Sequence, residues 1–199
     1  GTITDGSHND TYNESVNIIA DDNSPAIKID GKIVEIITNN PADGRISIVS
    51  DDTKNNAIDV NDGKVILNAA DENYISVNGQ YGIVTAGDEN SKVTLTAKNN
   101  TIISAGGSSS SAIKAGNDEN DKSSIEIIST EGDIAITIGN KDNPFGNNDA
   151  IAAKGGNLSL NASEDIILNS YSNKSSDGTA VRIEHGGNAV LTAGNDVLI

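Results

Sequence analysis

Residues 150–170 read AIAAKGGNLSLNASEDIILNS, and residues 180–199 repeat the pattern as AVRIEHGGNAVLTAGNDVLI. Each stretch holds three short apolar pieces in the same order: one that begins with Ala, one that follows Gly-Gly-Asn and one that follows Asp. Leu158 and Leu160 alternate with Ser159 and Asn161, which is the period of a β-strand with one buried face. Each repeat therefore predicts three short strands.

The same three pieces recur along the chain. The first piece begins at residues 26, 57, 82, 112, 150 and 180, so the intervals are 31, 25, 30, 38 and 30 residues. A set of short strands that recurs at a variable interval is typical of a solenoid, because the stacked strands keep their length while the loops absorb the differences in interval. No stretch sustains the i, i+3, i+4 pattern of a long helix. We predict an all-β parallel β-helix of about 30 residues per turn, with three strands per turn and protruding loops.

The organisation of the chain follows from where this repeat is visible. Residues 1–15 match it weakly and are expected to form a leader loop or an incomplete first turn. Residues 16–199 are expected to form the β-helix segment, which we take to be part of a longer protein.

The composition suits a narrow solenoid interior and excludes several functions. The apolar residues are mostly Ile, Val, Leu and Ala, with one Phe, four Tyr and neither Trp nor Met; β-branched side chains pack well between stacked strands. A net charge of −16 argues against nucleic acid as a partner, because phosphate binding needs a basic surface. Without Cys there is no disulfide, and no apolar run approaches the roughly 20 residues that cross a bilayer.

The pieces Ala-Ile-x-Ala, Gly-Gly-Asn-Leu-x-Leu-x-Ala and Asp-Ile-Ile-Leu-x-Ser resemble the passenger of autotransporter or filamentous-haemagglutinin-type adhesins, over about residues 16–199. The resemblance implies a right-handed, three-sided β-helix that is displayed extracellularly from a Gram-negative outer membrane. It also implies a virulence-related role in cell adhesion, self-aggregation or biofilm formation, with host surface or matrix molecules, or other copies of the chain, as partners. A trimeric adhesin head, in which three chains share one core, is the competing architecture.

An enzyme is the main alternative function, because parallel β-helices include polysaccharide lyases and hydrolases. Glycoside hydrolysis needs two carboxylates at a defined separation, in a groove with aromatic and cationic groups. Here the only guanidinium groups are those of Arg45 and Arg182, and only five residues are aromatic. His185 precedes Gly186-Gly187 but has no paired-aspartate motif beside it. We therefore predict a non-catalytic protein without catalytic residues; a purely structural stalk is the third hypothesis.

Acidic loops at residues 87–90, 117–121 and 142–149 offer the hard oxygen ligands that calcium prefers. None reproduces the twelve-residue calcium loop or the glycine-aspartate nonapeptide repeat. We therefore predict no cofactor and no metal ligands, with Ca²⁺ as the alternative.

Candidate binding residues come from outward strand positions and from the most protruding loop. Stacked turns are expected to align outward polar residues into ladders, and many weak contacts along a rod add through multivalency. The candidates are Thr94, Thr96, Ser159 and Asn161 on strands, and Asn143 and Phe145 in the loop over residues 139–149. Some positions that are expected to point outward carry apolar residues, which predicts either that a loop covers them or that they form an exposed apolar stripe. These residues are Ile37, Ile66, Val84, Ile128 and Ile167.

Overall fold

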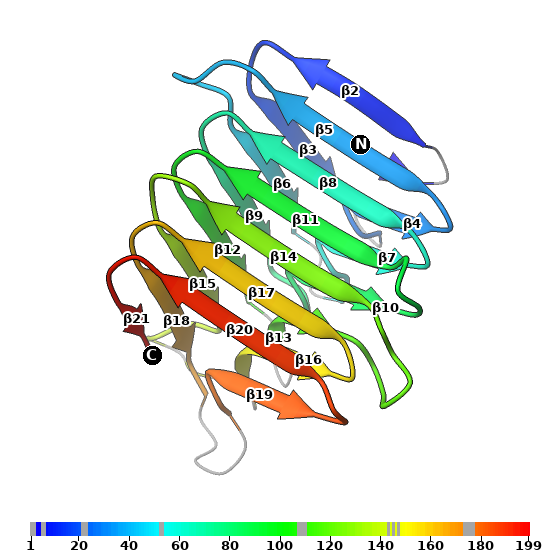
Figure 1. The fold of residues 1–199 in the computed structure, drawn as a ribbon, viewed down its shortest axis with the longest axis vertical. Helices are drawn as coiled ribbons and strands as arrows, with labels where there is room; N and C mark the ends of the chain where they lie inside the picture. The colour runs from blue at the N-terminus through cyan, green and yellow to red at the C-terminus, as the bar shows by residue number, and fades with distance from the viewer. Residues whose placement is uncertain are drawn as a thin grey trace.

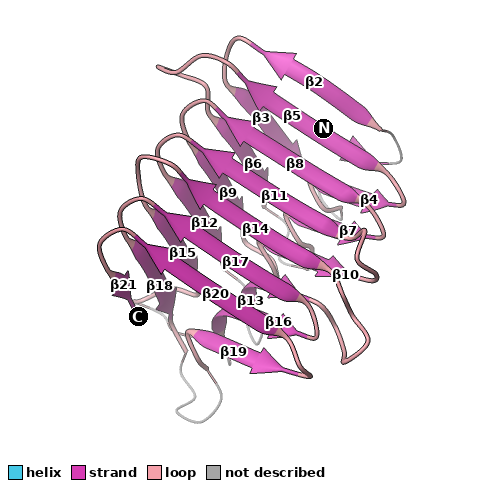
Figure 2. Cartoon of the chain, in the orientation of Figure 1, coloured by secondary structure: helices cyan, strands magenta, loops and turns pink. Residues whose placement is uncertain are grey.

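The computed structural model describes residues 3–4, 7–20, 24–51, 54–106, 111–142, 144, 146, 148–172 and 178–199. All regular elements in these ranges are β-strands, which the chain winds into three sheets of seven strands each (Figures 1 and 2). The described part of the chain has no helix long and apolar enough to cross a membrane.

Successive strands enter the three sheets in turn. Sheet A contains β1 (Ile3–Thr4), β4 (Ile27–Asp30), β7 (Ile58–Asn61), β10 (Ile83–Ala86), β13 (Ser111–Ala115), β16 (Asp149–Lys154) and β19 (Val181–Glu184). Sheet B contains β2 (His8–Tyr12), β5 (Ile33–Thr38), β8 (Lys64–Ala69), β11 (Lys92–Ala97), β14 (Ser124–Ser129), β17 (Asn157–Ala162) and β20 (Asn188–Ala193). Sheet C contains β3 (Val16–Ala20), β6 (Ile46–Ser50), β9 (Asn73–Val77), β12 (Thr101–Ala105), β15 (Ile134–Ile138), β18 (Ile166–Ser170) and β21 (Val197–Leu198).

Every strand pairs in parallel with the strand one turn away, so the predicted three-strand right-handed β-helix is confirmed. The register in sheet A links Ile27, Ile58, Ile83, Ile113, Ile151 and Val181 in one row, which reproduces the predicted intervals. The longest interval, between Ile113 and Ile151, contains the segment between β15 and β16. The differences in length between turns therefore lie in the loops and not in the paired strands, as the variable interval of the repeat predicts.

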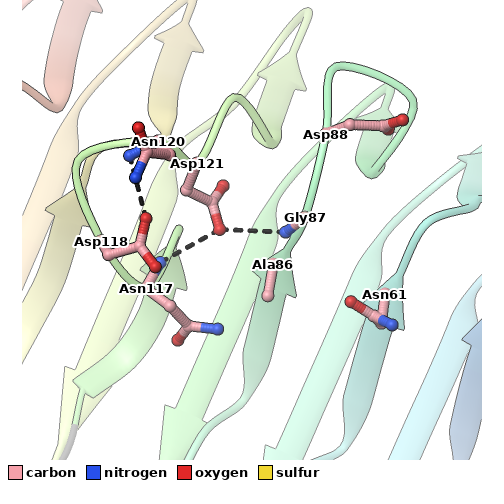
Figure 3. A pocket seen from close by; sticks show the side chains of 8 residues that line it. All are labelled: Asn61, Ala86, Gly87, Asp88, Asn117, Asp118, Asn120 and Asp121. Carbon is pink, nitrogen blue, oxygen red and sulfur yellow. Dashed lines mark hydrogen bonds between the residues drawn. The ribbon is translucent and has the colours of Figure 1, made fainter.

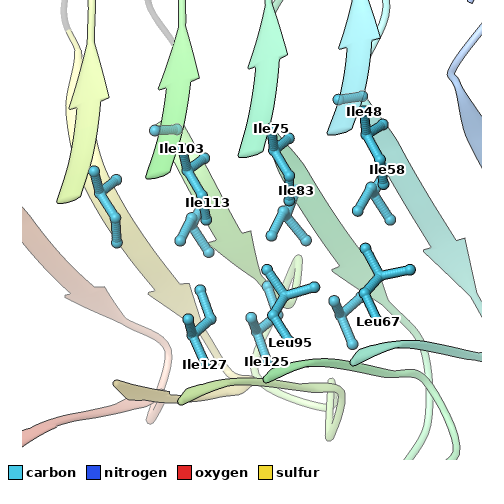
Figure 4. Packing of buried hydrophobic residues seen from close by; sticks show 14 of the residues in the cluster. Ile48, Ile58, Leu67, Ile75, Ile83, Leu95, Ile103, Ile113, Ile125 and Ile127 are labelled. Carbon is cyan, nitrogen blue, oxygen red and sulfur yellow. The ribbon is translucent and has the colours of Figure 1, made fainter. Parts of the chain in front are cut away.

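The core consists of aliphatic side chains that point inward from all three sheets and stack turn upon turn (Figure 4). Ile103, Ile113 and Ile125 come from sheets C, A and B of adjacent strands and are each fully or almost fully buried. Strand β11 shows the alternation that produces this packing, because Val93, Leu95 and Ala97 are buried between half-buried polar neighbours. The core is thus closed by three sheets of one chain, and no partner chain is needed to complete it.

The corner between sheets B and C is held by side chains that bind the backbone of the next turn. The Oδ1 atom of Asn100 accepts a hydrogen bond from the backbone N–H of Asp133 at 3.0 Å. The Oδ1 of Asp133 accepts in the same way from Asp165 at 2.9 Å, and the Oδ1 of Asp165 accepts from Asp196 at 3.0 Å. This ladder satisfies corner N–H groups that the strand ladders leave unpaired.

The first and last turns differ from the middle of the solenoid. Residues 1–15, expected to form a leader loop or an incomplete first turn, contain β1 and β2, the first strands of sheets A and B. Strand β2 places His8 and Asp10 at register positions that are held by buried aliphatic residues in the next two turns, and it places Tyr12 opposite the buried Thr38. Ile183 and Val197, at inward positions of β19 and β21, are 52% and 43% exposed, because no further described strand packs on them.

Candidate functional site

The four candidate binding residues on strands all lie on the outer surface of sheet B. Thr94 and Thr96 project from β11, and Ser159 and Asn161 project from β17, two strands away. Thr94, Thr96 and Ser159 are half-buried between neighbouring strands, whereas Asn161 is exposed. The other two candidates, Asn143 and Phe145, lie outside the described residues.

The strand between β11 and β17 interrupts the expected polar ladders. Register places Glu126 of β14 between Thr94 and Ser159, and Ile128 of β14 between Thr96 and Asn161. The outward rows of sheet B therefore mix hydroxyl, carboxylate and aliphatic side chains.

A shallow groove of about 320 Å³ lies on this surface of sheet B, and Ser159 lines it. We call it the sheet B groove; its lining consists of Lys92, Ser124, Ile125, Glu126, Asn157, Leu158, Ser159, Asn188 and Val190. The Nζ atom of Lys92 donates a hydrogen bond to Oε2 of Glu126 at 2.9 Å, so its two charged side chains are paired with one another. The lining thus combines the amide and hydroxyl groups of two Asn and two Ser residues with three aliphatic side chains, and none of its described residues is aromatic.

The outward apolar residues do not form one stripe. Ile37, Ile66 and Ile128 lie on sheet B, Val84 on sheet A and Ile167 on sheet C. Val84 is only 8% exposed although it occupies an outward position, while the other four are half-buried.

A second pocket, of about 420 Å³, lies where the loops over residues 87–91 and 116–123 stack at the corner between sheets A and B (Figure 3). We call it the loop pocket; it is lined by Asn61, Ala86, Gly87, Asp88, Asn117, Asp118, Asn120 and Asp121. Both loops are acidic in the sequence, but the joining of the two loops by one side chain was not predicted. The common Asp-Glu-Asn motif at residues 88–90 and 118–120 was the available signal.

Asp121 joins the two loops. Its Oδ2 accepts hydrogen bonds from the backbone N–H of Gly87 at 2.9 Å and of Asn117 at 3.1 Å (Figure 3). Its Oδ1 accepts a hydrogen bond from the backbone N–H of Ser123 at 2.9 Å. The side chain is buried, with 8% of the residue exposed. A carboxylate that accepts three backbone hydrogen bonds is well suited to hold a loop conformation.

The other acidic residues of the loop pocket are engaged in local turns. Asp88 accepts from the backbone N–H of Asn90 at 2.7 Å, and Asp118 accepts from that of Asn120 at 2.9 Å. In the described part of the chain, no three or more His, Cys, Asp or Glu side chains are grouped so that they could hold a metal ion. Most carboxylate oxygens of this pocket already accept hydrogen bonds from the loops themselves.

A lysine beside the loop pocket faces the outside of sheet A. Burial lowers the pKa of Lys114, the nearby Lys154 lowers it further, and Asp121 opposes both effects. Its Nζ donates a hydrogen bond to Oδ1 of Asn117 at 2.5 Å and lies 5.7 Å from the centre of the Tyr81 ring. These contacts hold the side chain against the corner.

The histidine considered for catalysis, His185, occupies the exposed corner after β19 with a left-handed backbone φ of +57°. His8 lies on β2, with its Nδ1 at 4.0 Å from Oδ2 of Asp10.

No family model, no curated protein and no solved structure matches this chain.

Proposed function

We propose that this chain is a non-catalytic adhesive segment, displayed at the surface of a Gram-negative bacterium, that binds host surface or matrix molecules or further copies of itself. One observation carries the proposal: the register of sheet B is kept without a shift from β5 to β20, so equivalent outward positions recur once per turn. A rigid rod with regularly spaced contact groups binds through many weak contacts, whose effects add along its length.

The properties of the surface agree with a binding role. The sheet B groove offers hydroxyl and amide groups, which can donate and accept hydrogen bonds to a polar polymer such as a glycan. A net charge of −16 keeps such a rod soluble and separates it from acidic neighbours. The paired Lys92 and Glu126 are the only charged residues that line the groove.

The test is a bead assay. Beads coated with the purified chain are incubated with host cells, with immobilised matrix proteins and with one another, and bound or aggregated beads are counted. We expect binding or aggregation that uncoated beads do not show. Beads that bind no cell, no matrix protein and no other bead at any coating density contradict the proposal.

Two matched variants examine whether the sheet B surface is responsible. The first replaces four candidate residues by Ala on one chain, namely Thr94, Thr96, Ser159 and Asn161. The second makes the same change at four outward residues of sheet C, namely Ser76, Ser104, Thr137 and Asn169, and is compared with the first for binding to host cells and not for binding between copies. We expect host-cell binding to fall for the first variant only; an equal fall for both assigns binding to another part of the chain.

A further inference from the structure

The outer surface of sheet C differs from the other two in its charge. Its outward residues form two rows along the solenoid, which the register of sheet C defines. The first row is Asn17, Ser47, Tyr74, Ile102, Ala135, Ile167 and Leu198, and the second is Ile19, Val49, Ser76, Ser104, Thr137 and Asn169. None of these described residues is charged, and we call this surface the uncharged face.

The other two sheets carry charges at equivalent positions. The outward row of sheet A includes Lys28, Asp59, Lys114 and Arg182, and the outward rows of sheet B include Glu35, Lys64, Lys92 and Glu126. The charged side chain of Arg45 reaches over the uncharged face, because its guanidinium carbon is 4.5 Å from the centre of the Tyr74 ring. Its Nε is 3.3 Å from Oε1 of Glu72, so this charge is balanced.

We propose that two copies of this chain pack against each other through the uncharged face. This inference rests on the proposed function and names one partner, a second copy, and the surface that receives it. Two rods that each carry a net charge of −16 repel one another. The uncharged face is the sheet surface on which they can approach without placing charged strand residues opposite like charges.

The chemistry of the uncharged face fits such a pairing. The first row is largely apolar, since it contains Tyr74, Ile102, Ala135, Ile167 and Leu198. Beside it run the hydroxyl groups of Ser76, Ser104 and Thr137, which can hydrogen-bond across an interface. An apolar row with hydroxyl groups beside it supplies both kinds of contact that specific protein interfaces combine, namely apolar packing and hydrogen bonds.

The dimensions of the uncharged face predict a weak but specific pair. Seven strands spaced about 4.8 Å apart, with five residues of about 3.3 Å each, cover roughly 500 Å² per copy. Two copies would bury about 1,000 Å², which is the lower limit for a specific interface. The association is therefore expected to depend on concentration and to strengthen when many turns align side by side.

Symmetry indicates which residues meet at the centre. A pair of identical surfaces is related by a two-fold axis, and β12 is the central strand in the order of sheet C. Ile102 and Ser104 are the outward residues of β12, so each is expected to lie near its own counterpart in the partner copy.

The decisive experiment measures the mass of the purified chain by sedimentation over a range of concentrations. The wild type is expected to show a monomer–dimer equilibrium that shifts toward the dimer as salt screens the net charge. Ile102→Glu is expected to raise the dissociation constant more than about tenfold, because two carboxylates are brought together near the axis. Ile66→Glu makes the same change at a half-buried outward position of sheet B and is expected to leave the equilibrium unchanged.

A second measurement introduces no charge, so it does not require the fold to accommodate a Glu side chain at a half-buried position. The chain contains no Cys, so Ser104→Cys introduces a single thiol near the expected axis and Thr94→Cys a single thiol on sheet B. A short thiol-reactive cross-linker is expected to join Ser104→Cys copies at a concentration at which Thr94→Cys copies remain separate.

The outcomes distinguish this inference from the proposed function. A wild type that stays monomeric at high protein and salt concentration, or equal cross-linking of both Cys variants, overturns the pairing through sheet C. Chains that pair in this way but whose beads bind neither cells, matrix nor one another contradict the adhesive role instead.

Discussion

Asp121 is expected to be the residue on which the shape of the loop pocket most depends. Its buried carboxylate accepts hydrogen bonds from the backbone N–H groups of Gly87, Asn117 and Ser123, which belong to two successive turns. In Asp121→Ala all three N–H groups lose their acceptor at once. Water has partial access to the N–H groups of Gly87 and Asn117, because their hydrogen bonds to Asp121 are part-buried. It has little access to the N–H group of Ser123, whose hydrogen bond is buried.

The magnitude follows from those three bonds. A hydrogen bond to a charged acceptor contributes about 1.5–3 kcal/mol, and an unsatisfied buried donor costs about 1–3 kcal/mol. With partial access of water to two of the groups, we expect Asp121→Ala to lower the free energy of unfolding by about 3–4 kcal/mol. Asp118→Ala is the control, because it removes one exposed hydrogen bond, to the N–H of Asn120, and should cost only about 0.5–1.5 kcal/mol.

The assay combines urea unfolding with amide hydrogen exchange. Exchange at Gly87 and Ser123 is expected to accelerate in Asp121→Ala and to remain slow in Asp118→Ala, since local opening and not global unfolding governs these loops. Asp121→Asn keeps one acceptor oxygen and should fall between the two variants. Equal loss of stability in Asp121→Ala and Asp118→Ala, with unchanged exchange at Gly87, would refute the assignment.

Three further predictions concern the core, the outer surface and a corner. Leu95→Ala removes a fully buried side chain and should lower the free energy of unfolding by about 2–5 kcal/mol, whereas Thr94→Ala beside it should change it by less than about 1 kcal/mol, both by urea unfolding. Burial raises the pKa of Asp59, against the opposing effects of Asn56 and Lys28, so its folded pKa lies above its unfolded value and stability falls as the pH rises above about 4. Asp59→Asn should therefore melt at a higher temperature than the wild type at about pH 7, and the difference should vanish at about pH 3; a constant difference at both pH values contradicts this. Gly155 has a φ of +82°, and a Cβ there would overlap the carbonyl oxygen of Asp118, so Gly155→Ala should lower the melting temperature and loosen the loop pocket, which exchange at Asn117 would report.

The strands and their order could be predicted from sequence because their causes are local. Alternation such as Leu158-Ser159-Leu160 marks one buried face, and Gly-Gly at residues 155–156 and 186–187 marks corners, so neither depends on distant residues. The spacing of the first piece then predicted which strands stack, and the pairs Ile27–Ile58 and Ile113–Ile151 confirm it. A narrow interior permits one arrangement of these strands, because a shift of one residue would expose every buried side chain.

The candidate site was harder to predict, because it depends on neighbours that are one turn apart. Thr94 and Ser159 were correctly placed outward, but they are separated by Glu126, so the polar ladder expected from each strand alone is a mixed row. In the same way, the acidic loops could be recognised in the sequence, whereas the hydrogen bond from the backbone N–H of Gly87 to the carboxylate of Asp121 could not.

From residue 16 onward, the sequence by itself determined the fold class, the number of strands per turn and the inward or outward direction of most strand residues, since these follow from short-range periodicity. The tertiary structure alone decided which outward residues become neighbours. Loops of different length separate equivalent positions by 24 to 38 residues, and a surface exists only once the strands have stacked. The uncharged face of sheet C is therefore a property of the register between turns: each strand contributes at most two residues to it, and the absence of charge emerges only when all seven are aligned.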